Sequence, residues 1–216
     1  MSAEASRAAG LRWGAPVFVF VLAVVALAPA FRDGYVLDDV AQVYHLRLPP
    51  PTLAGWVDAA TYPWWSRARQ WTAWRPVTRL AILAEKSAVA RIGTREPWPY
   101  RVASIALHGI ACVLVAVLAR TLGFAWPAAG AAGAILAVHP LRSEPVHQIV
   151  GQGELLVAVL LAAGAALYVR ARSRGWRWPA IALTQAVCYA VALGAKEHAV
   201  VYPAYLALVE AAIGRE

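Results

Sequence analysis

Charged residues are scarce in this chain of 216 residues, because Asp, Glu, Lys and Arg together make up only 15% of it. Soluble domains carry about 25% charged residues and about 45–50% apolar residues. Here 61% of the residues are hydrophobic. A soluble core of this size does not need so much apolar surface, so the composition argues against a soluble globular domain and favours a membrane protein.

Cysteine is also scarce. Cys112 and Cys188 are the only two, and each lies inside an apolar run. Their number and spacing fit neither a disulfide framework nor a zinc site, so we interpret both as small apolar packing residues. The sequence has no internal repeat either, which argues against the duplicated halves of many transporters.

The basic residues outnumber the acidic ones, and the formal net charge is +8. They lie between the apolar runs and not along one soluble face, which argues against nucleic acid as a partner. Membrane lipid with anionic headgroups is the partner that this arrangement predicts.

Apolar runs without Asp, Glu, Lys or Arg predict an all-α fold, a polytopic helical bundle of about six spans in a single transmembrane domain, residues 1–216. A spanning helix needs about 20 mostly apolar residues, and backbone in lipid must satisfy its own hydrogen bonds. The predicted spans are Ala15–Phe31, Val102–Ala119, Thr121–Leu141, Leu155–Val169, Trp178–Ala195 and a shorter one, Ala199–Val209.

The first run follows Arg7 and Arg12 and has features of a signal peptide, but Pro29 and the later spans favour an uncleaved helix. Short loops rich in Arg or Lys usually face the cytoplasm. Arg120 and the four arginines within residues 170–177 fall on the same side as the N-terminus if the spans alternate. The predicted protein is therefore an integral, multi-pass membrane protein with a cytoplasmic N-terminus.

Between the first two spans lies a long first extracytoplasmic loop, about residues 32–101. It is rich in Trp, which prefers the headgroup level of a bilayer. Val77–Ile92 within it contains four charged residues and so predicts an interfacial helix, not a span.

Separated polar residues all fall on the extracytoplasmic side of this topology, which predicts a site at that membrane surface. Placing a charged side chain near the membrane core costs free energy, so charged residues there are candidates for a function. Adjacent carboxylates can act as a general base or bind a divalent cation, and Arg and Lys can hold a phosphate. The candidates are Asp38, Asp39, Arg75, His139, Arg142, Glu144, Lys196 and Glu197.

The order of these blocks resembles the N-terminal membrane half of GT-C glycosyltransferases, in the branch of O-mannosyltransferases that carry tetratricopeptide repeats. The blocks that carry the resemblance are Asp38-Asp39, Trp74 to Thr78, Tyr100 to His108, His139 to Glu144, Gly151 to Leu156, and Lys196-Glu197. One departure is Gln152, where the family often has Arg. Family members continue through further spans and repeats, so the chain is expected to correspond to the first part of such a protein.

The resemblance implies transfer of a sugar from a polyprenyl-phosphate donor to a hydroxyl of a protein or glycan acceptor. It implies Asp39 as the catalytic base, with Asp38 supporting it or binding a divalent cation. It also implies substrate-phosphate binding by Arg75, His139, Arg142, Glu144, Lys196 and Glu197. A truncated or inactive form of such an enzyme fits the same pattern.

A non-catalytic membrane protein is the alternative, either a transporter-like subunit or a protein that binds lipid phosphate. On this interpretation Asp38-Asp39 caps a helix, Arg75 anchors a helix start at the headgroups, and His139-Pro140 only ends a span.

Overall fold

The computed structural model describes the backbone of residues 3–64 and 73–214, and the side chains of this part from residue 14 onwards. Within these residues every regular element is helical. In chain order the elements are α1 (Ala3–Leu27), η1 (Ala28–Arg32), η2 (Val40–Tyr44), α2 (Leu53–Thr61), α3 (Pro76–Ile92), α4 (Trp98–Thr121), α5 (Trp126–Val138), η3 (Pro140–Arg142), α6 (Ser143–His147), η4 (Ile149–Gly151), α7 (Gln152–Ser173), α8 (Trp178–Ala195), η5 (Glu197–Val201) and α9 (Tyr202–Ile213).

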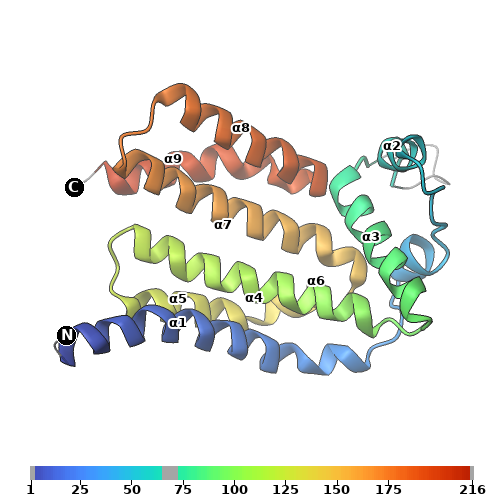
Figure 1. The fold of residues 1–216 in the computed structure, drawn as a ribbon, viewed down its shortest axis with the longest axis horizontal. Helices are drawn as coiled ribbons and strands as arrows, with labels where there is room; N and C mark the ends of the chain where they lie inside the picture. Colours follow the sequence, from blue (N-terminus) through green and yellow to red (C-terminus); the bar gives the residue numbers. More distant parts are fainter. Residues whose placement is uncertain (1–2, 65–72, 215–216) are drawn as a thin grey trace.

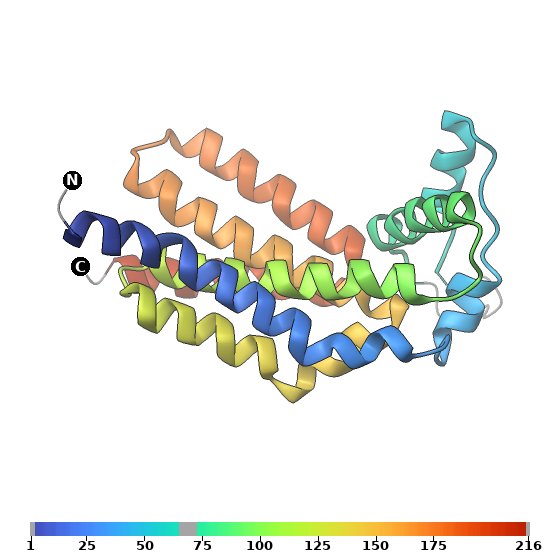
Figure 2. The ribbon, with the colours of Figure 1, turned by 60° about the horizontal axis from the view of Figure 1, so that its bottom comes forward.

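The long helices run roughly side by side along the length of the molecule, with α4 and α7 at the centre (Figures 1 and 2). α4 packs against α1, α5 and α7, and α7 packs in turn against α8 and α9. Small residues allow close approach between these helices. A Cβ on Gly133 of α5, for example, would lie 2.7 Å from the carbonyl oxygen of Cys112 on α4.

Four helical segments are long and apolar enough to cross a membrane, which confirms the predicted all-α membrane bundle. They are Gly14–Arg32, Trp98–Thr121, Ile149–Ser173 and Trp178–Ala195.

The other two predicted spans form shorter helices, the 13-residue α5 and the 12-residue α9. The predicted start of the third span at Thr121 is wrong, since Thr121 is the last residue of α4. Gly123, at a φ of 94°, allows the turn that follows. Pro127 then stands in the first turn of α5, where a missing backbone N–H costs nothing.

The two ends of the bundle differ in content (Figure 1). One end, called here the loop end, is formed by residues 28–97, 139–151 and 196–201. The opposite end, called here the basic end, is formed by residues 120–125 and 172–177 and lies beside both chain termini. All the polar site candidates from the sequence belong to the loop end. A common site requires them to lie at one end of the bundle in this way.

α3 covers part of the loop end, lying across the ends of α7 and α8 (Figure 1). It begins at Pro76 and ends at Gly93, whose φ of 77° is the left-handed cap that favours glycine. Gly194 lets it close on α8, because a Cβ there would lie 2.9 Å from Val77. The Thr78 hydroxyl donates to the Ala195 carbonyl oxygen at 2.7 Å. The helix predicted over Val77–Ile92 is thus confirmed.

Candidate active site at the loop end

Asp39 lies in the interior of the loop end, with no exposed surface. Its Oδ2 accepts a hydrogen bond from Nη2 of Arg101 at 3.2 Å, and its Oδ1 accepts from the backbone N–H of Val150 at 3.0 Å. Arg101 is equally buried and also donates to the carbonyl oxygen of Gly34 at 2.8 Å. A buried charge needs such pairing, and this one joins the first loop to α4 and η4.

Asp38 differs from its neighbour because it is exposed to solvent. The preceding residue, Leu37, has a φ of 47°, in the left-handed region that a branched side chain rarely adopts. Strained backbone of this kind is kept only where the surrounding structure holds it. Here the hydrogen bonds of the buried Asp39 fix the backbone, and the neighbouring carboxylate of Asp38 faces solvent.

Arg75 and Glu197 form a two-pronged ion pair between the start of α3 and η5. Nε of Arg75 donates to Oε2 of Glu197 at 2.9 Å, and Nη2 donates to Oε1 at 2.5 Å. These hydrogen bonds lower the pKa of Glu197 to about 2. The guanidinium also lies 5.5 Å from the ring centre of Trp64, a cation–π contact.

Lys196, the neighbour of Glu197, pairs with Glu154 at the start of α7. His198 follows in η5, and its pKa is lowered, first by burial and then by the charge of Lys196. The structure therefore brings Arg75, Lys196 and Glu197 together. Both cations, however, already face a carboxylate of the protein itself.

The segment that follows α5 carries the remaining predicted residues. His139 is exposed, and its Nδ1 accepts from the backbone N–H of Leu141 at 3.3 Å. Glu144 is also exposed, and its Oε1 accepts only a long 3.5 Å contact from Gln148. Arg142 is half-buried. Among the described residues it forms no ion pair. These three residues thus form a group apart from the Arg75–Glu197 pair.

Glu85 and Gln152 form a polar contact beneath the loop that the sequence did not reveal. Nε2 of Gln152 donates to Oε2 of Glu85 at 2.9 Å and lies 3.3 Å from both the Tyr100 carbonyl oxygen and the Ser104 hydroxyl. Burial raises the pKa of Glu85 to about 7, against a smaller lowering by the Gln152 hydrogen bond. At the position where the family often has Arg, the amide nitrogen of Gln152 thus bonds within the protein, whereas its buried Oε1 has no hydrogen-bond partner among the described residues.

Asp33 of the loop end and Arg101, which lies just beneath it in the first turn of α4, are further residues that the sequence did not single out. Arg101 pairs with Asp39, and Asp33 pairs with His147 of α6. Arg101 stands one residue before the predicted second span, and a charge at that depth is a usable signal. Nothing in the sequence pointed to its partner, which lies 62 positions away.

The sequence left a divalent cation at Asp38 and Asp39 open as one alternative. In the ranges 3–64 and 73–214 no group of three His, Cys, Asp or Glu side chains lies close enough to hold a metal ion. The oxygens of Asp39 are already bonded within the protein. A metal therefore remains an alternative that rests on the sequence alone.

Two Drosophila melanogaster proteins share a segment with this chain, Protein O-mannosyl-transferase Tmtc2 and Protein O-mannosyl-transferase Tmtc1. Each is 36% identical to it over 86 residues, which is 40% of this chain. Over that segment, the chain is similar to O-mannosyl-transferases. The matched segment covers 9% of the first relative and 10% of the second. No family model and no solved structure matches the chain.

Proposed function

We propose that the chain is a membrane glycosyltransferase, or part of one, whose reaction takes place at the loop end. The donor is a sugar on a polyprenyl phosphate, and the acceptor is a hydroxyl of a protein or glycan. The partial similarity to O-mannosyl-transferases supports the reaction class. The observation that carries the proposal is an exposed carboxylate, Asp38, held beside a buried one at that end.

The acidic pair divides its roles according to exposure. An inverting transfer needs a base that takes the proton of the acceptor hydroxyl while the phosphate leaves from the opposite face. Asp38 is open to an acceptor, whereas both oxygens of Asp39 are bonded to Arg101, Val150 and the nearby backbone. We therefore assign the base to Asp38 and the positioning of that base to Asp39, the reverse of the assignment made from the sequence.

The leaving phosphate needs cations that stabilise its developing charge. Arg142 and His139 are the predicted residues without a carboxylate partner in the described part of the chain. Arg75 and Lys196 hold carboxylates already and would bind phosphate only by exchanging Glu197 and Glu154 for it. Glu144 and Glu197 would then modulate charge and not contact phosphate.

The base assignment is tested with an Asp38→Asn variant of the protein as its genome encodes it. Transfer of labelled mannose from polyprenyl-phosphate mannose to a Ser/Thr peptide is measured in membranes. Loss of a general base lowers the rate by about 10²–10⁴-fold. The control is Asp58→Asn, an exposed carboxylate on α2 in the same loop, which should keep the wild-type rate. Full transfer by the Asp38→Asn variant would remove the proposed role.

The orientation is part of the same proposal, with the loop end outside and the basic end in the cytoplasm. Arginines on the short loops of the basic end support it, since such loops stay inside. In intact cells an impermeant thiol reagent should label an Asp38→Cys variant and leave an Arg174→Cys variant unlabelled, with the natural protein as background. The opposite labelling pattern would turn the topology around.

A further inference from the structure

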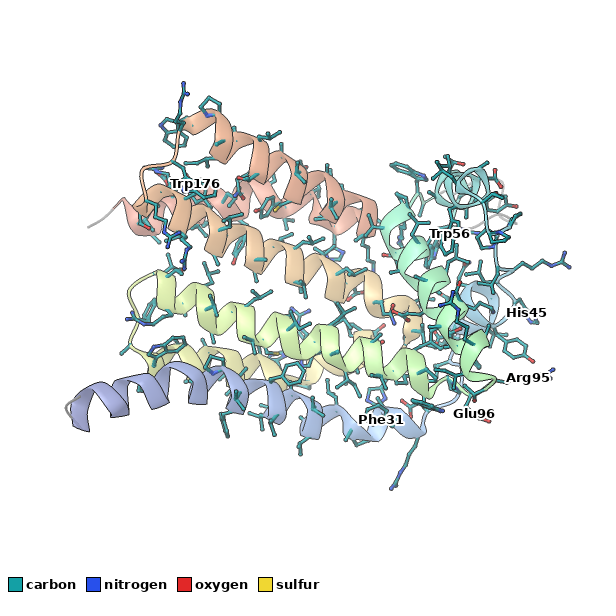
Figure 3. All side chains as sticks on the ribbon, viewed as in Figure 1. Phe31, His45, Trp56, Arg95, Glu96 and Trp176 are labelled. Atoms are coloured by element: carbon teal, nitrogen blue, oxygen red, sulfur yellow. The ribbon has the colours of Figure 1, made fainter. Side chains whose placement is uncertain are left out.

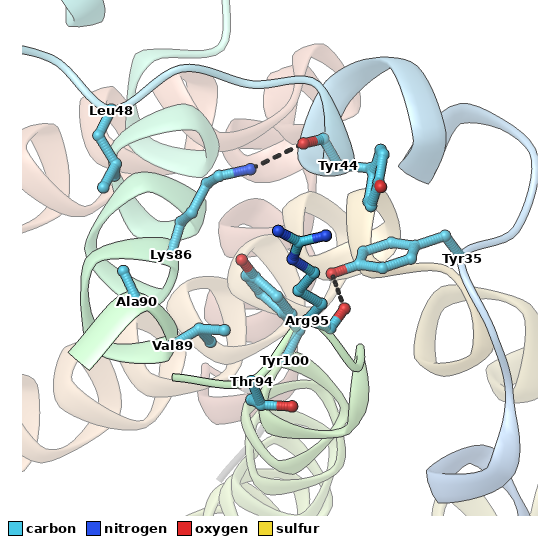
Figure 4. A pocket seen from close by; sticks show the side chains of 9 residues that line it. All are labelled: Tyr35, Tyr44, Leu48, Lys86, Val89, Ala90, Thr94, Arg95 and Tyr100. Atoms are coloured by element: carbon cyan, nitrogen blue, oxygen red, sulfur yellow. Dashed lines mark hydrogen bonds between the residues drawn. The ribbon is translucent and has the colours of Figure 1, made fainter. Parts of the chain in front are cut away.

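A pocket of about 430 Å³ opens beside the acidic pair and plays no part in the roles given above. Three separate segments form it: the chain around η2, the second half of α3, and the connection that leads into α4 (Figure 4). Small-molecule sites have volumes of about 300–1,000 Å³. The pocket therefore has room for one sugar-sized ligand with a charged substituent.

Three tyrosines supply its aromatic walls. The ring of Tyr35 meets the ring of Tyr44 edge to face at 5.3 Å, and it meets the ring of Tyr100 in the same manner at 6.5 Å. The hydroxyl of Tyr35 donates to the carbonyl oxygen of Arg95 at 3.3 Å, which fixes this wall. Tyrosine offers a ring face for C–H groups and a hydroxyl for hydrogen bonds, and a sugar ring needs both.

Two cations, Lys86 and Arg95, also line the pocket, and none of the residues that line it is acidic. Nζ of Lys86 donates to the carbonyl oxygens of Val43 at 2.6 Å and Tyr44 at 3.0 Å. An ammonium has three donors, so one is left over. Burial also lowers the pKa of Lys86, and a nearby anion would offset that effect.

Arg95 is exposed, and its guanidinium points into the same space as the Tyr100 hydroxyl (Figure 4). Within residues 14–64 and 73–214 neither Arg95 nor Lys86 forms an ion pair. The contrast with Arg75 and Lys196, which are both neutralised, is direct. An anion that reaches the loop end finds uncompensated charge in this pocket.

We infer that the pocket between Tyr35, Tyr100, Lys86 and Arg95 binds a sugar phosphate, with the ring against the tyrosines and the phosphate between the two cations. The sugar part of this inference rests on the proposed function, whereas the anion part rests on the charges alone. The same chemistry could come from the headgroup of a lipid-linked sugar or from a soluble sugar phosphate.

Binding of mannose 1-phosphate to the purified chain in detergent micelles tests the inference by titration calorimetry. Arg95→Ala is the informative variant, because its exposed side chain makes no described contact that the fold needs, and the Tyr35 hydroxyl bonds to its backbone. We expect Kd to rise about tenfold or more, as for loss of a charged hydrogen bond. The matched control is Arg91→Ala, an exposed arginine in the last turn of α3 that lies outside the pocket, with less than a twofold change.

Competition by polyprenyl-phosphate mannose in the same micelles separates the two sources. Displacement of mannose 1-phosphate assigns the pocket to a lipid-linked headgroup, and binding without displacement assigns it to a soluble sugar phosphate. Absence of binding by the natural chain, or equal Kd values for the Arg95→Ala and Arg91→Ala variants, overturns the inference. If transfer still depends on Asp38 in that case, the proposed function stands without this pocket.

Discussion

The loop end carries more Lys and Arg residues than the basic end, and the two ends differ in how these cations are paired. In the part of the chain that the structure describes, four of the five ion pairs lie at the loop end or just beneath it, and they join segments far apart in sequence. At the basic end Arg172 pairs with Glu210. Cations in ion pairs fix the positions of the segments that they join, whereas cations without a carboxylate partner can bind anionic lipid headgroups.

Arginines at the basic end also contact aromatic rings. The guanidinium of Arg172 lies 4.6 Å from the ring centre of Trp178, and that of Arg120 lies 5.9 Å from that of Trp126. Figure 3 shows Trp176 at this end, with Trp56 and Arg95 at the other. Arginine and tryptophan together are typical of a membrane interface. Arginine thus stacks on aromatic rings at the basic end, whereas Arg75 and Arg101 form ion pairs that join separate segments at or just beneath the loop end.

Breaking the Asp39–Arg101 pair should have the largest effect on stability. An Asp39→Ala variant leaves Arg101 charged in the interior, which costs about 3–5 kcal/mol. An Arg172→Ala variant at the basic end, where the ion pair is partly exposed, should lower the stability much less, because solvent screens such a pair. Thermal unfolding in detergent, followed by the fluorescence of the ten tryptophans, measures both. Equal losses would contradict the contrast between the ends.

Glu85 should make the free energy of unfolding depend on pH, with a smaller effect than loss of the Asp39–Arg101 pair. Its pKa is raised from 4.5 to about 7 by burial, so the folded state holds a proton that the unfolded state releases between these values. Stability therefore falls as the pH rises from about 4.5 to about 7 and is constant above that.

A Glu85→Gln variant removes the ionisation and can still accept the hydrogen bond from Gln152. The free energy of unfolding of this variant should exceed that of the natural chain by about 3 kcal/mol at pH 8, with little difference near pH 4.5. Glu96→Gln, which removes an exposed carboxylate at the same end, serves as the control in the same pH series. A Glu85→Gln variant with an unchanged pH profile would show that this carboxyl titrates normally.

Helices were the part of the fold that the sequence predicted best. Trp178–Ala195 was predicted to the residue, and Val77–Ile92 within one residue, because composition alone separates an apolar run from an interfacial one. The prediction of a span over Thr121–Leu141 was wrong because this run contains a turn around Gly123 and a helix start at Pro127, which hydropathy does not detect.

The site was predictable in its location but not in its pairings. Counting spans was enough to place Asp39 and Lys196 at one end. The pairing of Arg75 with Glu197 spans 122 positions, and no local pattern encodes it. Nor could the sequence tell Asp38 from Asp39, because the backbone turn at Leu37 decides which of two adjacent carboxylates faces inward.

The ion pair between Arg75 and Glu197 also limits how early the loop end can form during synthesis. With 122 positions between them and synthesis at about 5–20 residues per second, the arginine leaves the ribosome roughly 6 to 24 seconds before its partner exists. Gly194, against which α3 packs, is synthesised almost as late as Glu197. The contacts that the start of α3 makes with α8 and η5 can therefore form only after most of the described chain has been synthesised.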